Sequence, residues 1–441
     1  MMQSGGFSPA SLFAGGIAGA WYGPSDLSTL FQDSAGTTPV TTTGQPVGLM
    51  LDKSKGLVLG PEVVTNGGGP FTSTTGYSAV GSATISIDTG RLKVVQTVGF
   101  TEGVFYLLPD NTFSNRTVIS FDVDLGSSTL VQVQAGNGSF GNGETVTQNI
   151  TSSGTYNIIT TVLRNGGSGI TFKAGSATNF FLSRISIREF PGNHATQATA
   201  AARPTYQTGP ARATLDKVDD RLSVTVPTGG FTGTMVLATD QGTASYGVTI
   251  PAGAYDIGGL YFPGNAIVGQ VIRDGALSAG DAAATEAYFV ANGATAGYGA
   301  VTNFSSYWRD WSEITSFPLI DTSSGTIFYQ TWFNNTSLTS FPANAFDNVS
   351  GGNFTDAFTN TALTQTSIDN ILVSLVTSGI ATGTRVFDQS GGSAPSAAGE
   401  AAIDTLRSRG WTVTVTGGYS SASLSALFAG GQQGLLFKPE R

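Results

Sequence analysis

Short apolar runs separated by Gly, Asn and Asp fill the stretch from residue 61 to residue 191. Such runs, rich in β-branched and aromatic side chains and often alternating with polar residues, are typical of strands. The predicted strands cover 84–88, 91–98, 104–108, 117–125, 129–135, 145–150, 156–163, 169–174 and 180–189. Because turn residues separate most neighbouring runs, the pattern predicts an antiparallel sandwich of about nine strands.

The C-terminal third contains an internal repeat, carried by SYWRDWSEITSFP (306–318), QTWFNNTSLTSFP (330–342) and DAFTNTALTQTS (356–367). Trp308, Phe333 and Phe358 recur at one constant spacing, and Ile314, Leu338 and Leu363 nearly keep the same spacing. A unit of this size cannot bury its apolar face alone, so stacked repeats are predicted to form a short solenoid.

Helical spacing of apolar residues appears in three places. Ser278 is a candidate N-cap, with Asp281 three residues later, for a helix that ends at about Ala291. Further helices are predicted over 367–379 and about 395–409. With strands at 384–392 and 411–417, the last two helices predict an α/β cap on the repeats.

Composition narrows the function classes. The chain of 441 residues has no Cys, a net charge of −9 and only 11% charged residues. Since Lys and Arg form no run, we expect no nucleic-acid partner. No apolar segment reaches transmembrane length, so we expect no membrane insertion. Residues 1–20 lack the pattern of a secretion signal, which favours release by lysis as part of an assembled particle.

Four motifs carry a family resemblance: Trp21-Tyr22-Gly23-Pro24-Ser25, Asp52-Lys53-Ser54, Gly192-Asn193-His194-Ala195-Thr196-Gln197 and Asp219-Asp220-Arg221-Leu222. Together they resemble the concanavalin-A-like (LamG-type) domains of phage and bacterial surface proteins. The family's central loop is split here between Ser54 and Gly192. We therefore expect a split β-domain, 1–60 and 192–297, with 61–191 inserted at a loop tip. The short interval between Leu222 and Ile267 predicts a reduced sandwich.

Two further modules are predicted by resemblance. The inserted segment opens with GPEVVTNG (60–67) and closes with FFLSRISIRE (180–189), and it resembles the jelly-rolls of carbohydrate-binding modules, although it has no Trp. The segment 298–418 resembles the leucine-rich repeats of bacterial surface proteins. The whole is expected to be mainly β: sandwich or jelly-roll modules, then a leucine-rich-repeat solenoid with an α/β cap. Residues 419–441 are expected to form a tail. In it, ALFAGGQQG (426–434) resembles SLFAGGIAG (11–19), either by chance or as a docking or gene-duplication boundary element.

The sequence offers few residues that could take part in catalysis. His194 is the single His, and we expect its ring to bond a backbone carbonyl in a loop. No G-x-S-x-G motif is present. The pairs Asp122/Asp124 and Asp219/Asp220 fit turns or calcium binding at least as well as glycosidase chemistry. We therefore expect no catalytic residue, no metal site and no cofactor, with a structural calcium ion as the open alternative.

Exposed aromatic rings are the candidates for ligand binding, because sugar rings stack their C–H faces on them. Neighbouring residues of a strand point to opposite faces, so an inward Phe333 column would turn Tyr307 and Trp332 outward. Trp311 would flank this pair. The alternative for this surface is a subunit contact or cover for a sheet edge. Weaker candidates in the insert are Tyr77, Phe105 and Tyr106.

The resemblances imply a non-enzymatic surface protein of a tailed-phage virion, similar to tail fibres or head fibres. Expected partners are other virion proteins and host cell-surface polysaccharide, bound multivalently by a homo-oligomer, with a trimer favoured. Its expected location is the exterior of the particle. Two alternatives stay open: a purely structural assembly protein and a polysaccharide-degrading enzyme.

Overall fold

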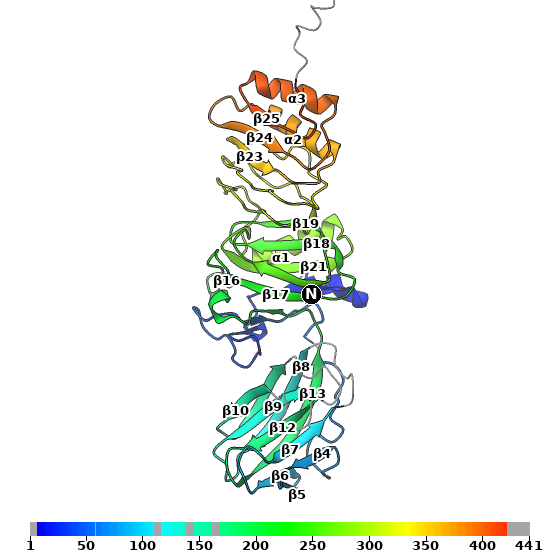
Figure 1. Ribbon diagram of the computed structural model, residues 1–441, viewed down its shortest axis with the longest axis vertical. Helices are drawn as coiled ribbons and strands as arrows, with labels where there is room; N and C mark the ends of the chain where they lie inside the picture. Colours follow the sequence, from blue (N-terminus) through cyan, green and yellow to red (C-terminus); the bar gives the residue numbers. More distant parts are fainter. Residues whose placement is uncertain (1–6, 58, 109–115, 138–144, 161–167, 421–441) are drawn as a thin grey trace, which may run out of the picture. The chain divides into compact units, whose positions relative to one another are not determined.

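The computed structural model describes residues 7–57, 59–108, 116–137, 145–160 and 168–420 (Figure 1). Strands dominate this part of the chain, and most of them pair in antiparallel sheets, so the prediction of a mainly β protein is confirmed. The chain divides into two compact units. The first comprises Met1–Thr243 and Ile250–Ala296, and the second comprises Ala244–Thr249 and Gly297–Arg441.

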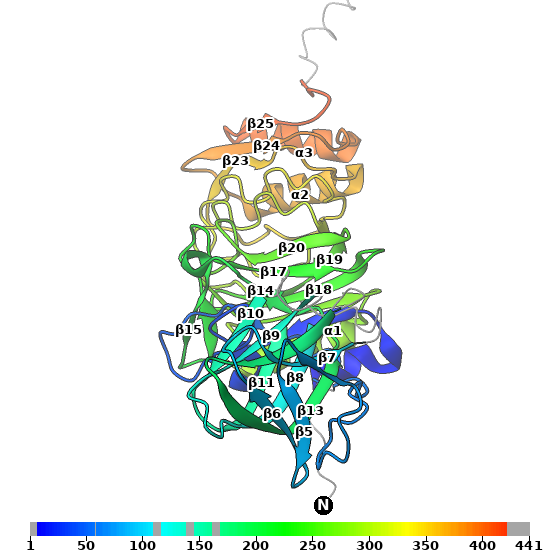
Figure 2. The same ribbon diagram turned by 60° about the horizontal axis from the view of Figure 1, so that its bottom comes forward.

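Within the first unit, the segment 61–191 forms two five-stranded antiparallel sheets. One has the order β10 (Thr145–Ile150), β9 (Val131–Asn137), β12 (Ser168–Ala174), β7 (Gly103–Leu107), β4 (Tyr77–Val80). The other has the order β11 (Gly154–Thr160), β8 (Arg116–Asp124), β13 (Thr178–Phe190), β6 (Arg91–Gln96), β5 (Thr84–Asp88). Figure 2 brings strands of both sheets forward.

One apolar core joins these two sheets. The rings of Phe121 on β8 and Phe172 on β12 meet edge to face, with centroids 5.1 Å apart. Alternation along each strand supplies the rest of the core. On β6, Leu92 and Val94 are fully buried, whereas Arg91 and Lys93, which precede them, are partly exposed. The nine strands predicted in this segment are all present, and β4 is an additional one. The part of the predicted strand 156–163 that covers residues 161–163 lies outside the described residues.

The segments before and after this insert pair with each other in shared sheets. β1 (Gly19–Tyr22) pairs with β21 (Ala266–Asp274), which also pairs with β16 (Arg212–Thr214) and β18 (Phe231–Thr239), and β15 (Thr205–Gln207) follows β16 at the edge. A second sheet has the order β2 (Leu30–Phe31), β3 (Leu49–Met50), β14 (Ala195–Thr196), β17 (Arg221–Val226), β20 (Gly253–Gly258). Strands of both sheets therefore lie between Leu222 and Ile267, the interval from whose short length we expected a reduced sandwich.

Helical elements of the first unit are few among the described residues. Three short 3-10 helices cover Pro9–Gly16, Leu27–Thr29 and Ala200–Ala202. The helix α1 (Ala279–Ala291) begins as predicted: the Ser278 Oγ accepts from the Asp281 N–H at 3.1 Å and donates to the Asp281 carboxylate at 2.8 Å. Both the helix and its cap are confirmed.

The second unit is a stack of repeats followed by a small parallel sheet. β19 (Thr243–Ile250) pairs with β22 (Ile314–Ser316) through Gly247 and Val248. The parallel sheet has the order β23 (Gly352–Phe358), β24 (Arg385–Gln389), β25 (Thr412–Thr414). Figure 1 shows α2 (Gln365–Ser378) and α3 (Ala397–Ser408) beside these strands, as predicted for the cap.

Stacked rings form the core of the repeats. One column, with centroids 5.1 and 4.4 Å apart, consists of Phe304, Phe328 and Phe354. A second column, with centroids 5.8 and 4.7 Å apart, consists of Trp308, Trp332 and Phe358. Each ring lies over its counterpart in the next repeat, so neighbouring repeats bury one another as predicted for a solenoid.

The steps between successive repeats are unequal. A ladder of polar side chains shows it: Asn334 bonds Asp310 at a sequence separation of 24, and Asn360 bonds Asn334 at a separation of 26. The parallel bridges that join Asn303 to Ile327 and Ile327 to Asn353 follow the same two steps. The constant spacing predicted from the sequence is therefore the mean of a shorter and a longer step.

Candidate functional site

Trp332 does not face outward, so the predicted Tyr307–Trp332 platform is wrong. Its side chain is 0% exposed and lies in the column between Trp308 and Phe358. The reason is the shorter first step, which aligns Trp308 with Trp332 instead of Phe333. A shift by one residue exchanges the two faces of an extended chain. The partly exposed residue is Phe333, against which the Arg309 guanidinium packs at 4.8 Å.

Tyr307 and Trp311 are both partly buried. The Tyr307 ring packs edge-on against Phe304 and Trp308, with centroids 5.5 and 5.6 Å away. The Trp311 ring lies 6.5 Å from that of Tyr246. Part of each of these two side chains therefore packs on the aromatic core, and ligand binding by them stays a prediction.

Tyr77 and Tyr106 point into the core of the insert. They are 7% and 4% exposed, and their ring centroids are 5.2 Å apart. The Tyr106 hydroxyl accepts from the Thr65 N–H and donates to the Val63 carbonyl, both at 3.2 Å. Burial raises the pKa of Tyr77 well above its ordinary value. The prediction that these two rings offer a stacking surface is wrong, because β4 and β7 turn them inward.

Phe105 precedes Tyr106 on β7. Its side chain faces the opposite side of the sheet and is partly exposed. Its ring lies across the neighbouring strand β12 at Gly169, where an added Cβ would come within 2.2 Å of two ring atoms. Gly169 therefore leaves room for the Phe105 ring, which a larger residue at this position would displace. Adjacent residues of a strand face opposite ways, so Phe105 and Tyr106 cannot both lie on the surface, and the fold shows that Phe105 does.

Polar side chains surround this ring in register. Across the sheet, Gln134 pairs with Thr171, Thr171 with Phe105, and Phe105 with Ser78. The next row pairs Gln132 with Lys173, while Leu107 on β7 is 56% exposed. The Gln134 Oε1 is buried and has no hydrogen-bond partner among the residues that the structure describes. We call this side of the sheet the Phe105 face. It comprises Ser78, Phe105, Leu107, Gln132, Gln134, Thr171 and Lys173, of which Thr171 and Lys173 are buried.

The outer face of the other sheet is occupied by ion pairs. The Arg91 guanidinium covers the Phe181 ring at 4.0 Å and contacts the Asp124 carboxylate at 2.8 Å. Arg184 contacts Asp122 at 3.1 Å, and this hydrogen-bonded guanidinium holds the pKa of Asp122 below its usual range. Asp122 and Asp124, two residues apart on β8, are therefore structural partners of two arginines.

His194 joins the two chain segments that flank the insert. Its Nδ1 accepts from the Asp52 N–H at 2.9 Å, which leaves Nε2 to donate to the Phe190 carbonyl at 3.1 Å. The predicted bond from the ring to a backbone carbonyl is confirmed. The ring also stacks on Phe190 with centroids 4.8 Å apart. These contacts are those of a structural residue.

Asp52 is the most heavily bonded carboxylate at this junction. It accepts from the backbone N–H groups of Trp21, Ser54 and Asn193, each at 2.8 Å, and from the Ser54 hydroxyl at 2.9 Å. Burial raises the pKa of Asp52, and these hydrogen bonds oppose that rise. Because its donors come from both sides of the insert, Asp52 ties together the segments that the motif comparison had paired.

Asp216, Asp219 and Asp220 bring carboxylate oxygens within 4.8 Å of one another. The Asp216 carboxylate accepts from the N–H groups of Val218, Asp219 and Asp220 at 2.8, 3.2 and 3.2 Å. This is the bonding of an Asp that closes a turn on its own backbone. The geometry accounts for the cluster as a turn, and structural calcium stays an expectation.

Comparison with known proteins gives no relative by sequence. No family model matches the chain, and no curated protein matches it significantly. None of the described helices is both long enough and apolar enough to cross a membrane.

Three solved structures illustrate the structural likenesses. One is a Clostridium thermocellum xylanase with a family 22 carbohydrate-binding module and a family 10 hydrolase module, complexed with xylohexaose: 11% identity, TM-score 0.24, covering 30% of this chain and 29% of that one. A mutant family 29 carbohydrate-binding module shows 15% identity and a TM-score of 0.24, covering 30% and 92%. The C-terminal family 22 module of the same xylanase shows 14% identity and a TM-score of 0.23, covering 29% and 92%.

Proposed function

We propose that this protein binds glycans through the Phe105 face of its inserted sandwich. The observation that carries the proposal is the partly exposed Phe105 ring, which lies over Gly169 on the face that also carries Ser78, Gln132 and Gln134. A flat apolar ring offers a stacking surface for the C–H face of a sugar. The exposed Ser78 hydroxyl and the partly exposed Gln132 and Gln134 amides offer hydrogen bonds to its hydroxyls.

The donor and acceptor chemistry of this face suits a hydroxyl-rich ligand. Each Gln amide presents both an acceptor oxygen and a donor nitrogen, as a sugar hydroxyl also does. The Gln134 Oε1, buried without a partner among the described residues, is an acceptor placed beside the aromatic row. Binding sites with a few placed polar groups around an apolar surface are the usual form of small-ligand recognition.

The proposed mode of action is binding without catalysis, on the exterior of a phage particle. The resemblance of the motifs at 21–25, 52–54 and 192–197 to phage surface proteins supports this location. Several copies on one particle, as in the trimer expected from that resemblance, would multiply a weak contact with host polysaccharide into a strong one. Purified particles, tested by quantitative mass spectrometry for the copy number of this chain, check the location.

The binding proposal is tested with Phe105→Ala. The full chain, coupled to beads at high valency, is applied to an array of bacterial and plant polysaccharides. We expect at least one polysaccharide to bind, with about a tenfold or greater loss in F105A, since truncating an aromatic anchor costs more than about 1 kcal/mol. Phe181→Ala is the matched control, because Arg91 already covers that ring on the other sheet.

Two outcomes would overturn the proposal. One is that the wild-type chain binds no polysaccharide at high valency, which would favour a structural role in assembly. The other is equal binding by wild type and F105A. New reducing ends released from the bound polysaccharide would instead support the alternative of a degrading enzyme.

A further inference from the structure

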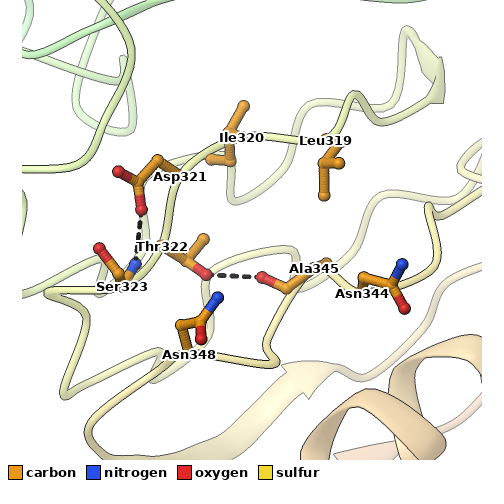
Figure 3. A pocket seen from close by; sticks show the side chains of 8 residues that line it. All are labelled: Leu319, Ile320, Asp321, Thr322, Ser323, Asn344, Ala345 and Asn348. Carbon is orange, nitrogen blue, oxygen red and sulfur yellow. Dashed lines mark hydrogen bonds between the residues drawn. The ribbon is translucent and has the colours of Figure 1, made fainter.

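A second site lies in the repeats, where an open pocket of about 310 Å³ is formed by two successive loops (Figure 3). Figure 3 shows the Leu319 and Asn348 side chains approaching it from opposite sides. The lining residues are Leu319, Ile320, Asp321, Thr322, Ser323, Asn344, Ala345 and Asn348.

In the first repeat, a short polar residue stands where the second repeat has an aromatic one. In the register set by the Asn303–Ile327 bridge, Thr322 occupies the position of Phe346. Phe346 is fully buried, with its ring centroid 5.6 Å from that of Phe328 and 4.9 Å from that of Phe354. The shorter Thr322 side chain instead donates a hydrogen bond to the Ala345 carbonyl at 2.6 Å.

The polar groups of the pocket are available for a ligand. The side chains of Asn344 and Asn348 make no hydrogen bond to any residue that the structure describes. The Asp321 carboxylate accepts from the Ser323 N–H at 2.9 Å, and this bond holds the pKa of Asp321 below its ordinary value. A carboxylate has about four acceptor positions, so it can accept further hydroxyl groups.

An apolar side chain completes the pocket. Leu319 is 62% exposed, whereas leucine side chains are most often buried in a core. It offers an apolar surface beside two amides and a carboxylate. This combination matches a ring with hydroxyl groups at its edge and C–H bonds on its face.

We infer that this pocket binds one neutral sugar ring, with Asp321, Asn344 and Asn348 bonding its hydroxyls and Leu319 packing on its C–H face. The volume lies at the lower end of the range for ligand sites, which suits a single ring better than an extended chain. The ionised Asp321 disfavours a uronic acid, because two like charges would meet in the pocket.

The choice of ligand class rests on the proposed glycan function, but the site shares no residue with the Phe105 face. Loss of one site therefore need not affect the other. In a glycan-binding protein, the pocket would recognise a single exposed sugar residue, while the Phe105 face would bind a glycan chain that lies along the surface of the sheet. The two can be separated by variants.

The experiment is saturation-transfer difference NMR on the full chain with glucose, galactose, mannose, N-acetylglucosamine and glucuronate as separate probes. Thr322→Phe enlarges a side chain that lines the pocket and is designed to reduce its volume. Thr336→Phe is the matched control, since Thr336 is exposed on the same array. We expect at least one neutral sugar to give a signal that T322F and N348A reduce at least tenfold, whereas T336F and F105A retain it.

Further outcomes decide the inference. The D321N variant is expected to gain a glucuronate signal that the wild type lacks. The inference is overturned if no neutral sugar binds, or if a bound sugar is unaffected by T322F while the thermal transition shows the variant folded. A signal lost in F105A but kept in T322F would assign the sugar to the Phe105 face alone. Should T322F fail to fold, N348A makes the same decision.

Discussion

At the scale of single residues, Asp52 shows how one buried carboxylate can hold together two segments that are far apart in the chain. Its four hydrogen bonds come from Trp21 and Ser54 before the insert and from Asn193 after it. The carboxylate is fully buried. Its removal would leave backbone donors without acceptors, and an unsatisfied buried donor is costly.

We expect Asp52→Asn to lower the free energy of unfolding by about 2 kcal/mol, because the new amide nitrogen would face the Asn193 N–H donor. The midpoint of chemical denaturation, with an unchanged slope, measures the effect. Asp88→Asn is the control: this carboxylate is partly exposed and lies 3.9 Å from Lys93, so a change within about 0.5 kcal/mol is expected. Equal midpoints for the two variants would contradict the role given to Asp52.

At the scale of elements, the repeats show why a mean period is a weak guide to side-chain direction. The bridges set one step shorter and one step longer than the mean, and the columns of stacked rings follow these steps. An alignment at the mean period finds the repeat and its buried Ile314, Leu338 and Leu363 correctly. It exchanges Trp332 with its neighbour, because adjacent residues of an extended chain face opposite ways.

The two registers predict opposite results for neighbouring substitutions. In the observed register, Trp332→Ala removes a fully buried ring and should destabilise the repeat unit by about 3–5 kcal/mol. Phe333→Ala removes a partly exposed ring and should cost about 1 kcal/mol or less. Thermal unfolding followed by tryptophan fluorescence and circular dichroism compares the variants. A larger loss for F333A would restore the register that the mean period predicts.

At the scale of the whole molecule, the inserted sandwich enters and leaves the surrounding chain at adjacent points. The Gly60 N–H donates to the Glu189 carbonyl at 2.8 Å, and Glu62 forms an antiparallel bridge with Arg188. An insertion whose ends lie side by side need not strain its host. One apolar cluster links insert and host: Leu49 and Leu51 pack with Ile159 and Phe190.

We therefore expect the chain to fold when residues 59–189 are replaced by a short Gly-Ser linker. Its stability should fall by roughly 1.5–3 kcal/mol, since Leu49 and Leu51 lose the Ile159 side chain. A cooperative thermal transition by circular dichroism, at a lower midpoint than in the full chain, is the expected readout. The isolated segment 59–191 is the companion sample, and it should also unfold cooperatively. Loss of a cooperative transition in both samples would show that they fold only together.

The sequence by itself determined the local elements. The strand predicted at 84–88 has the same bounds in the structure, and the helix after Ser278 begins with the predicted cap. Alternation, helical spacing and caps are properties of neighbouring residues, so they can be read without the fold. The strand Tyr77–Val80 was missed because so short a run, with Ser and Ala at its centre, carries little of that signal.

Only the tertiary structure decided which face of each strand is free and where a hollow remains. Alternation separates Phe105 from Tyr106, but burial against the second sheet decides that Tyr106 is core and Phe105 is surface. The pocket beside Thr322 is lined by residues 319–323 of one loop and by Asn344, Ala345 and Asn348 of the next. Both features arise from contacts between segments far apart in the chain, and a local pattern holds no information about the partner that covers a side chain or leaves it open.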